Sequence, residues 1–174
     1  MPELAIRDAL RAAIREEMLA NEQVVVMGED VGAYGGSYAV TKGLFEEFGP
    51  ERIIDTPISE LGFVGLGIGA AMTGIRPVVE IMTINFAFLA IDQIINSASK
   101  VHYMSGGQIN CPVLIRTTTG AGLSVGAQHS HTVEHWFAHV PGLKVVCPSN
   151  SYDAKGLLKT AFKDENPVIF VEHT

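Results

Sequence analysis

One stretch of the chain decides its fold: residues 52–74 read RIIDTPISELGFVGLGIGAAMTG. Its first three residues, Arg52-Ile53-Ile54, are typical of a short buried strand, and Asp55-Thr56-Pro57 supplies residues that end one. A glycine- and alanine-rich helix is expected from Leu61 to Thr73, with Gly74 ending it. The stretch therefore predicts a strand followed directly by a helix, which is the repeating unit of α/β folds.

The same alternation continues in both directions along the chain. Residues 6–18 place apolar side chains at helical spacing between arginines and glutamates, and Val24–Met27 is a short apolar run that predicts a strand. Further strands are expected at 78–82, 112–116, 143–147 and 168–171, and further helices at 87–104 and, after the N-cap offered by residues 149–151, at 152–163. The predicted fold class is α/β, with a parallel sheet covered by helices on both faces in three layers.

The length of 174 residues predicts one domain over residues 1–174. Residues 168–171 are the last expected strand, and Thr174 follows it closely, which we interpret as a cut at a domain edge. The chain opens without a charged segment followed by an apolar one, so we do not expect secretion.

Charge and hydropathy narrow the classes of partner. The formal charge is −7 and the pI about 5.3, with scattered basic residues, so we expect no binding to nucleic acid or to a membrane surface. No apolar run reaches the roughly 18 residues of a membrane span. Hydrophobic residues nevertheless make up 47% of the chain. This predicts a sheet buried on both faces together with a large subunit interface.

Cys111 and Cys147 are the two cysteines, and they form no C-x-x-C pair. We expect two buried thiols in a reducing compartment rather than a catalytic cysteine.

The glycines between residues 62 and 69 have two interpretations. Gly65 and Gly69 would let another helix approach closely, which would offset the cost of about 1 kcal/mol that each glycine brings to a helix. A dinucleotide-binding fingerprint instead requires glycines directly after a strand, at the start of the helix. Here the glycines lie within the expected helix and Glu60 occupies its start, so close packing is the better interpretation.

Glu60, Gly65-Leu66 and Gly69-Ala70 resemble the aminopyrimidine-binding motif of thiamine-diphosphate enzymes. The surrounding sequence is similar, in the same order, to the beta subunits of pyruvate dehydrogenase-type, thiamine-diphosphate-dependent 2-oxo-acid dehydrogenases. The similar segments extend over nearly the whole chain, at residues 52–60, 82–86, 92–98, 103–107 and 141–146. The resemblance implies the thiamine-diphosphate-binding fold in its pyrimidine-domain form, and it implies that the family's C-terminal domain lies outside this chain.

The activity that the resemblance implies is oxidative decarboxylation of pyruvate, followed by acetyl transfer to a lipoyl group. Such enzymes hold magnesium and the diphosphate with a Gly-Asp-Gly segment, which this sequence lacks. An alpha subunit would therefore supply that half of the site, within a heterotetramer of two alpha and two beta chains that serves a lipoyl-bearing acetyltransferase component. The chain alone is expected to be inactive, and the implied compartment is a bacterial cytoplasm or a plastid stroma.

Three side chains carry the implied chemistry. Glu60 would hydrogen-bond the aminopyrimidine ring and promote its activation, most effectively in an apolar pocket that Phe63, Ile84 and Phe86 could help to form. Its other interpretation is a carboxylate that stabilises a helix start. Phe86 matches a position that packs on the aminopyrimidine. His129 matches the family's active-site histidine, which is linked to substrate handling and reductive acylation. Core packing and loop ordering are the alternatives for these two residues.

The resemblance also implies a potassium site, built largely from backbone carbonyls. Its positions match Val113, Ala161, Phe162, Asp164 and Asn166. The segment Asp164–Pro167 is equally typical of a turn between a helix and a strand.

Residues 131–135 read HTVEH, which matches the H-x-x-E-H pattern of zinc peptidases. On a helix, His131 and His135 would share one face and could hold a metal. No third ligand is evident in the sequence, and we regard this pattern as a chance match.

Other functions stay open at this point. A branched-chain 2-oxo-acid or acetoin dehydrogenase would share the chemistry, although residues 56–60 and 104–107 look more like the pyruvate group. A non-catalytic interaction domain could retain the fold, but the complete Glu60 motif argues against it.

Overall fold

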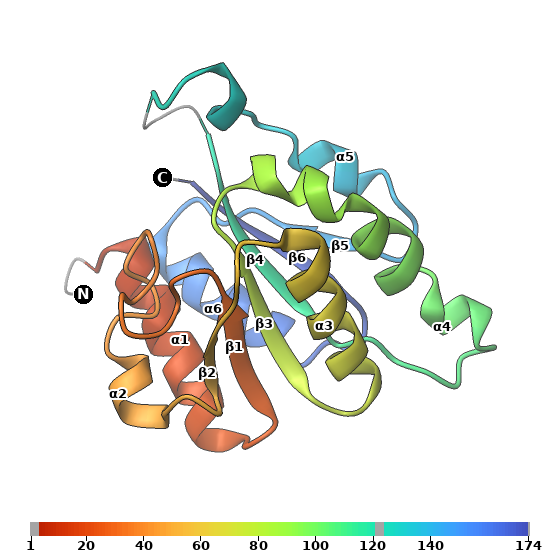
Figure 1. Cartoon of the computed structure of the whole chain (residues 1–174), viewed down its shortest axis with the longest axis horizontal. Coiled ribbons are helices and arrows are strands. Elements are labelled where there is room, and N and C mark those ends of the chain that lie inside the picture. Colours follow the sequence, from red (N-terminus) through yellow and green to blue (C-terminus); the bar gives the residue numbers. More distant parts are fainter. Residues whose placement is uncertain (1–3, 121–123, 174) are drawn as a thin grey trace.

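The computed structural model describes residues 4–120 and 124–173, and its centre is a six-stranded parallel sheet (Figure 1). The strands lie in the order β2-β1-β3-β4-β6-β5. The expected α/β fold with a parallel sheet is confirmed. The strands are β1 Val24–Gly28, β2 Ile53–Asp55, β3 Arg76–Ile81, β4 Leu114–Thr119, β5 Lys144–Val146 and β6 Val168–His173.

Helices cover both faces of the sheet and complete the three layers. The α-helices are α1 Ile6–Ala20, α2 Leu44–Phe48, α3 Glu60–Met72, α4 Val101–Met104, α5 Glu134–Ala138 and α6 Ser151–Ala161. The remaining helical pieces are the 3-10 segments η1 Ile84–Ala90 and η3 Ala127–His129 and the π-helical segment η2 Gln93–Ala98. Helices α1 and α6 pack together on one face of the sheet, while α3, η1, η2 and α5 contribute to the core on the other.

The α1–α6 face is built from amphipathic helices. Leu10, Ile14 and Met18 of α1 are fully buried, in one cluster with strand side chains such as Phe170. Lys155 and Lys159 of α6 pair with Glu16 of α1 at 2.6 and 2.7 Å. The predicted cap of α6 is confirmed at Asn150, whose Oδ1 accepts a hydrogen bond from Asp153 N at 2.9 Å.

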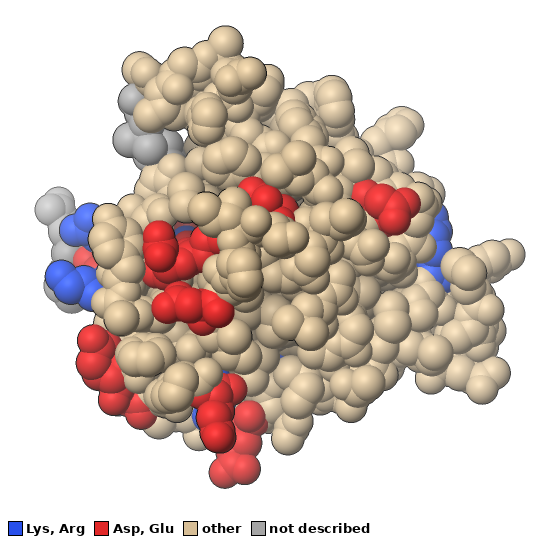
Figure 2. Space-filling model, viewed as in Figure 1, with Lys and Arg blue, Asp and Glu red and all other residues tan. Residues whose placement is uncertain are grey.

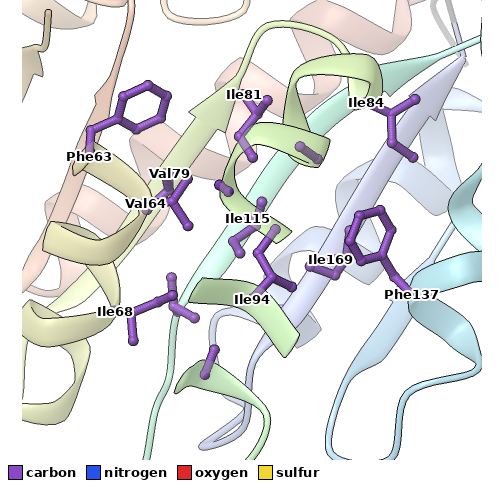
Figure 3. Packing of buried hydrophobic residues seen from close by; sticks show 14 of the residues in the cluster. Phe63, Val64, Ile68, Val79, Ile81, Ile84, Ile94, Ile115, Phe137 and Ile169 are labelled. Atoms are coloured by element: carbon purple, nitrogen blue, oxygen red, sulfur yellow. The ribbon is translucent and has the colours of Figure 1, made fainter. Parts of the chain in front are cut away.

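The opposite face holds a larger apolar core, part of which is drawn in Figure 3. Val64 and Ile68 of α3 are buried beside Val79 of β3. Gly67 lets the helix lie this close, because a Cβ atom at this position would overlap the Val79 side chain. The predicted close packing holds for Gly65, which faces Gln93 of η2, whereas a Cβ atom on Gly69 would meet nothing within 4 Å among the described residues.

The prediction of one regular helix over residues 87–104 is wrong, because the pitch of this segment changes from 3-10 to π. The Ser99 hydroxyl donates to Ile95 O at 2.6 Å, the oxygen that the Ser99 amide would use in an α-helix. The Ser99 amide bonds instead to Ile94 O at 3.2 Å, five residues back. A periodic apolar pattern does not reveal such a change of pitch.

Strand β4 is also displaced from its predicted range. It begins two residues after Pro112 and continues through Thr119, three residues beyond the predicted end at Arg116. These threonines are buried and pair with β6, and their β-branched side chains suit a strand. Over the part of the chain that the structure describes, no helix is long and apolar enough to cross a membrane.

Candidate active site

The carboxyl ends of parallel strands meet at one edge of a sheet, and this edge collects the polar side chains of the site. Strand β1 ends at Gly28, where a Cβ atom would lie 2.6 Å from Glu80 O, so glycine allows β1 and β3 to approach closely. The next strand, β2, is tied to it because Thr56 N donates to Gly28 O at 2.9 Å. Glu29 and Glu60 therefore follow neighbouring strands at the same edge.

Glu60 is the first residue of α3 and is only 5% exposed. Its position at a helix start favours a carboxylate. Phe63 and Ile84 are both buried and belong to one apolar cluster, against which Phe86 packs. The three residues predicted to form an apolar pocket thus share one apolar cluster, while the pocket around Glu60 and its catalytic role stay predictions.

Glu29 is the residue that the sequence interpretation missed. Its Oε1 is buried and has no hydrogen-bond partner among the described residues. Burial raises the pKa of this carboxyl group, and the charges of Glu60 and Asp30 raise it further. The signal was present in the sequence, because a carboxylate directly after a buried strand lies where α/β proteins bind ligands.

Phe86 and His129 are brought together by two segments far apart in sequence. Phe86 is half-buried in η1, and His129 is exposed at the end of η3. Their rings meet edge to face, with centroids 5.3 Å apart and planes at 79°. Helix α3, which starts with Glu60, packs against η1. The three predicted site residues thus lie on elements that touch one another.

The turn that carries His129 is fastened to its surroundings by polar contacts. Within the turn, Ser130 Oγ donates to Gly126 O at 2.8 Å. From η1, Asn85 Nδ2 donates to Gln128 O at 2.8 Å and also contacts His131 Nδ1. A cavity of about 10 Å³ beside this contact is lined by Thr83, Asn85, Thr119 and His129, among others. This volume is roughly that of one water molecule.

A second group of buried charges lies on the α1–α6 face of the same edge. Arg116 of β4 is 1% exposed and pairs with Glu80 of β3 and with Glu172 of β6, the latter through Nη2 at 2.7 Å. Burial opposes the charge on Arg116, but the two carboxylates outweigh it and raise the pKa of the guanidinium. These residues had no role in the sequence interpretation, because their pairing depends on strand order.

The positions proposed for potassium lie at the opposite edge of the sheet, beside the amino ends of β4 and β6. Val113 O accepts from Val168 N at 3.0 Å, and Arg76 Nη1 donates to Phe162 O at 3.0 Å and to Asp164 O at 3.4 Å. Oxygen donors of this kind suit a hard cation, and each carbonyl keeps a second lone pair. Ala161 O accepts from Asp164 N at 3.1 Å, and Asn166 N donates to Asp164 Oδ1 at 2.9 Å. These oxygens already accept hydrogen bonds within the chain, and potassium binding at these positions stays a prediction.

The H-x-x-E-H interpretation fails on local geometry. Helix α5 begins at Glu134, so His131 precedes it and shares no helical face with His135. His131 instead contacts Asn85 and packs on the Phe88 ring, with centroids 5.7 Å apart. In the ranges 4–120 and 124–173, no group of three or more His, Cys, Asp or Glu could hold a metal ion.

The prediction of two buried cysteines is half wrong. Cys111 is buried, and burial raises the pKa of its thiol to about 11, which makes it unreactive near neutral pH. Cys147 is exposed, because it directly follows the edge strand β5.

Comparison with known proteins identifies similar chains. The family model described as "Transketolase, pyrimidine binding domain" matches residues 2–174. The pyruvate dehydrogenase E1 component subunit beta of Rhizobium meliloti is 59% identical over 173 residues, which are 99% of this chain and 38% of that protein. The mitochondrial subunit beta-1 of Arabidopsis thaliana is 57% identical over 98% of this chain and 47% of its own length. This chain thus spans half or less of these relatives.

Two solved structures share the fold at low identity. A split-gene transketolase, described as an inactive beta4 tetramer, superposes with a TM-score of 0.77 at 23% identity, over 98% of this chain and 52% of that one. A transketolase variant from Pichia stipitis gives a TM-score of 0.77 at 18% identity, over 98% of this chain and 26% of its own. These similarities confirm the pyrimidine-domain form of the fold.

Proposed function

The chain belongs to the transketolase pyrimidine-binding domain family, and on that premise we propose that it forms the aminopyrimidine half of a thiamine-diphosphate site in a pyruvate dehydrogenase. The reaction would be oxidative decarboxylation of pyruvate with acetyl transfer to a lipoyl group. The relatives named as pyruvate dehydrogenase subunits beta, at 53% to 59% identity, support this choice of substrate.

The observation that carries the proposal is the pair of acidic residues at the sheet edge. Glu60 is buried at the start of α3, and the buried Oε1 of Glu29 lacks a partner among the described residues. A structural carboxylate is normally paired or hydrogen-bonded when it is buried. An acid left without a cation beside an apolar wall is instead suited to a ligand that itself carries hydrogen-bonding nitrogens.

This donor set fits an aminopyrimidine ring. The Glu60 carboxyl group would hydrogen-bond the ring nitrogen and move a proton to and from it, while Phe86 would pack on the ring face. Thiamine diphosphate, when bound, supplies an electron sink for decarboxylation. His129, in edge contact with Phe86, would act at the substrate end of the site, where an imidazole can accept or donate a proton.

The other half of the site would come from a partner. We propose an alpha subunit that holds magnesium and the diphosphate, a second beta chain in a heterotetramer, and a lipoyl-bearing acetyltransferase component as the acceptor. Leu61, Leu66 and Trp136 are each at least half exposed, and the face over α3 in Figure 2 carries few charged side chains. Such exposed apolar side chains support burial in an assembly.

The proposed organisation is one domain over residues 1–174, with a further domain elsewhere in the longer protein. Potassium, at Val113, Ala161, Phe162, Asp164 and Asn166, is proposed as a stabilising ion remote from the chemistry. The proposed compartment is a bacterial cytoplasm or a plastid stroma, and the relatives named as mitochondrial support an organelle equally well.

The test is an activity assay on the assembled enzyme. A full-length beta-type chain containing these residues is co-expressed with its alpha partner, and pyruvate-dependent reduction of an artificial acceptor is measured with thiamine diphosphate and magnesium. Glu60→Gln should abolish most of the activity. Glu51→Gln, at an exposed carboxylate beyond the other end of β2, is the matched control and should retain it.

The remaining outcomes separate the alternatives. Activity that prefers branched-chain 2-oxo acids or acetoin would retain the chemistry and change the substrate. An assembled complex that binds no thiamine diphosphate would favour a non-catalytic interaction domain.

A further inference from the structure

Asn85 lies between the segment that carries Phe86 and the turn that carries His129. It precedes Phe86 in η1, and its side chain is 8% exposed. Its amide nitrogen Nδ2 lies 2.8 Å from Gln128 O and also contacts His131 Nδ1. These two contacts hold the backbone directly before His129 and the side chain two residues after it.

The hydrogen-bonding groups of the Asn85 amide determine which tautomer of His131 the contact requires. A backbone carbonyl can only accept, so the group that faces Gln128 O must be the NH₂ of Asn85. That group has two hydrogens, and the second points to His131 Nδ1, which must then offer a lone pair. The contact therefore requires a His131 ring whose Nδ1 is unprotonated and whose proton is on Nε2. A protonated imidazole would direct an N–H against the amide N–H, and the contact would be lost.

Other contacts on the turn cannot replace this one. The bonds of His129 N and Ser130 Oγ to Gly126 O lie within the turn and do not connect it to the sheet. Thr119 Oγ1 lies 3.3 Å from His131 O and 3.2 Å from Glu134 Oε2, and its single hydrogen can serve only one of them. Asn85 thus provides the connection between η1 and the turn on the His129 side.

We propose that Asn85 is a positioning residue, which fixes His129 against Phe86 through a hydrogen bond to neutral His131. The proposal rests on the proposed function, because it assigns to Asn85 the placement of the active-site histidine. Asn85 holds both sides of the turn, so the backbone that carries His129 cannot move away from Phe86 without breaking at least one of the Asn85 contacts. The titratable groups that face this region are Glu134, linked to His131 through Thr119, His129 in the same turn, and Tyr38, which lines the small cavity beside Asn85. From η1, the uncharged Asn85 and Phe88 side chains contact His131.

The first test reads the tautomer directly in this chain. Nitrogen-15 NMR of ¹⁵N-histidine-labelled protein at pH 8 should show His131 with an unprotonated Nδ1 and a protonated Nε2. Asn85→Ala should give a mixture of tautomers and should shift the amide signals of residues 126–131. Asn96→Ala is the matched control, because Asn96 in neighbouring η2 donates to exposed Asp92, and it should leave these signals in place. A protonated Nδ1 in the wild-type chain would overturn the proposal.

The second test uses the assembled enzyme. Asn85→Ala should lower kcat for pyruvate-dependent turnover by about ten- to a hundred-fold, since a displacement of about 1 Å costs up to that much. His131→Ala should give a loss of similar size, and the double variant should lose little more than either single one. Additive losses would refute the coupling through His131.

The two tests also separate this proposal from the proposed function. An assembly inactive in wild-type form would contradict the proposed function, while the NMR spectrum would still decide the Asn85–His131 bond. If Asn85→Ala unfolds the chain, His131→Ala, which changes a half-buried surface ring, supplies the same comparison. A folded His131→Ala variant with wild-type kcat would overturn the proposal.

Discussion

Two groups of acidic residues, each with buried carboxyl oxygens, lie at the same edge of the sheet and differ in what surrounds them. Glu80 and Glu172 share one guanidinium, that of Arg116, on the α1–α6 side. Glu29 and Glu60 follow β1 and β2, and Glu29 Oε1 lacks a hydrogen-bond partner among the described residues. The first group has a cation built into the sheet, and the second leaves hydrogen-bonding capacity unused.

The difference predicts that the first group of carboxylates is structural and that the second is functional. Two carboxylates against one arginine make a group that strand pairing completes, with Glu80 opposite Arg116 in the register of β3 and β4. Such a group fixes which strands are neighbours. In the second group, Glu29 Oε1 has no hydrogen-bond partner among the described residues, and the proposed ligand would bind beside it. Substituting one residue of either group should therefore change either the stability or the activity of the protein.

The largest loss of stability is expected when Arg116 is replaced. Arg116→Met would leave Glu80 and Glu172 buried without a cation, and removing one partner of a buried ion pair costs about 3–5 kcal/mol. Urea unfolding followed by circular dichroism should show that the free energy of unfolding falls by this amount, or that the chain no longer folds. A loss below about 1 kcal/mol would mean that the group is not structural.

Glu60→Gln should lower activity and leave stability nearly unchanged, in contrast to Arg116→Met. The assembled enzyme should lose about a hundred-fold or more of its activity, as expected when a proton-transferring group is removed. The free energy of unfolding of the chain should change by only about 0.5 kcal/mol, because the substitution preserves shape and breaks no ion pair. A large loss of stability without loss of activity would place Glu60 in the structural group.

Glu80→Gln should cost less than Arg116→Met. The Arg116–Glu172 pair would survive, and the glutamine oxygen could still accept from the guanidinium, so we expect a loss of about 1 kcal/mol in the same unfolding assay. Glu165→Gln, at an exposed residue, is the control. A loss as large as that of Arg116→Met would show that both carboxylates are indispensable to the buried charge.

The smallest change in the free energy of unfolding is expected at Glu29, where substitution should stabilise the chain. Its pKa is raised in the folded state, so the folded chain binds more protons than the unfolded one from about the usual value of 4.5 up to the raised value. Stability therefore falls as pH rises through this window. Glu29→Gln should stabilise the chain at pH 7 by about half a kcal/mol, and the gain should vanish below pH 4. A destabilised variant at pH 7 would indicate a hidden partner for Glu29.

The fold was largely predictable because the strands are short apolar runs between turn residues. Val24–Met27 and Ile53-Ile54 are such runs, and an all-parallel sheet follows from their alternation with helices. Residues 84–104 were not predictable in detail, since an apolar pattern does not distinguish 3-10, π and α pitch within one helical segment. The short helix α2 was missed because it offers too few residues for a periodic pattern.

Candidate site residues could be predicted from the sequence only where a local motif exists. Glu60, Phe86 and His129 were selected from motif positions, and the structure places the two rings in contact. Glu29 and Asn85 had no such motif, and their roles depend on neighbours distant in sequence. The same limit explains the H-x-x-E-H match, whose two histidines share a face only if residue 131 is helical, and the structure shows that it is not.

The pitch of η1 gives this segment a threefold order that an α-helix could not offer. A 3-10 helix has 3.0 residues per turn, so side chains three apart stand in one column. Asn85 and Phe88 form one column, and both touch His131, while Phe86 stands in the next and touches His129. Asn85 and Phe86, which are adjacent in sequence, thus contact two different histidines. Redesigning η1 as a regular α-helix would gain helical stability. It would also displace Asn85 and Phe86 from their two histidines, even with every side chain unchanged.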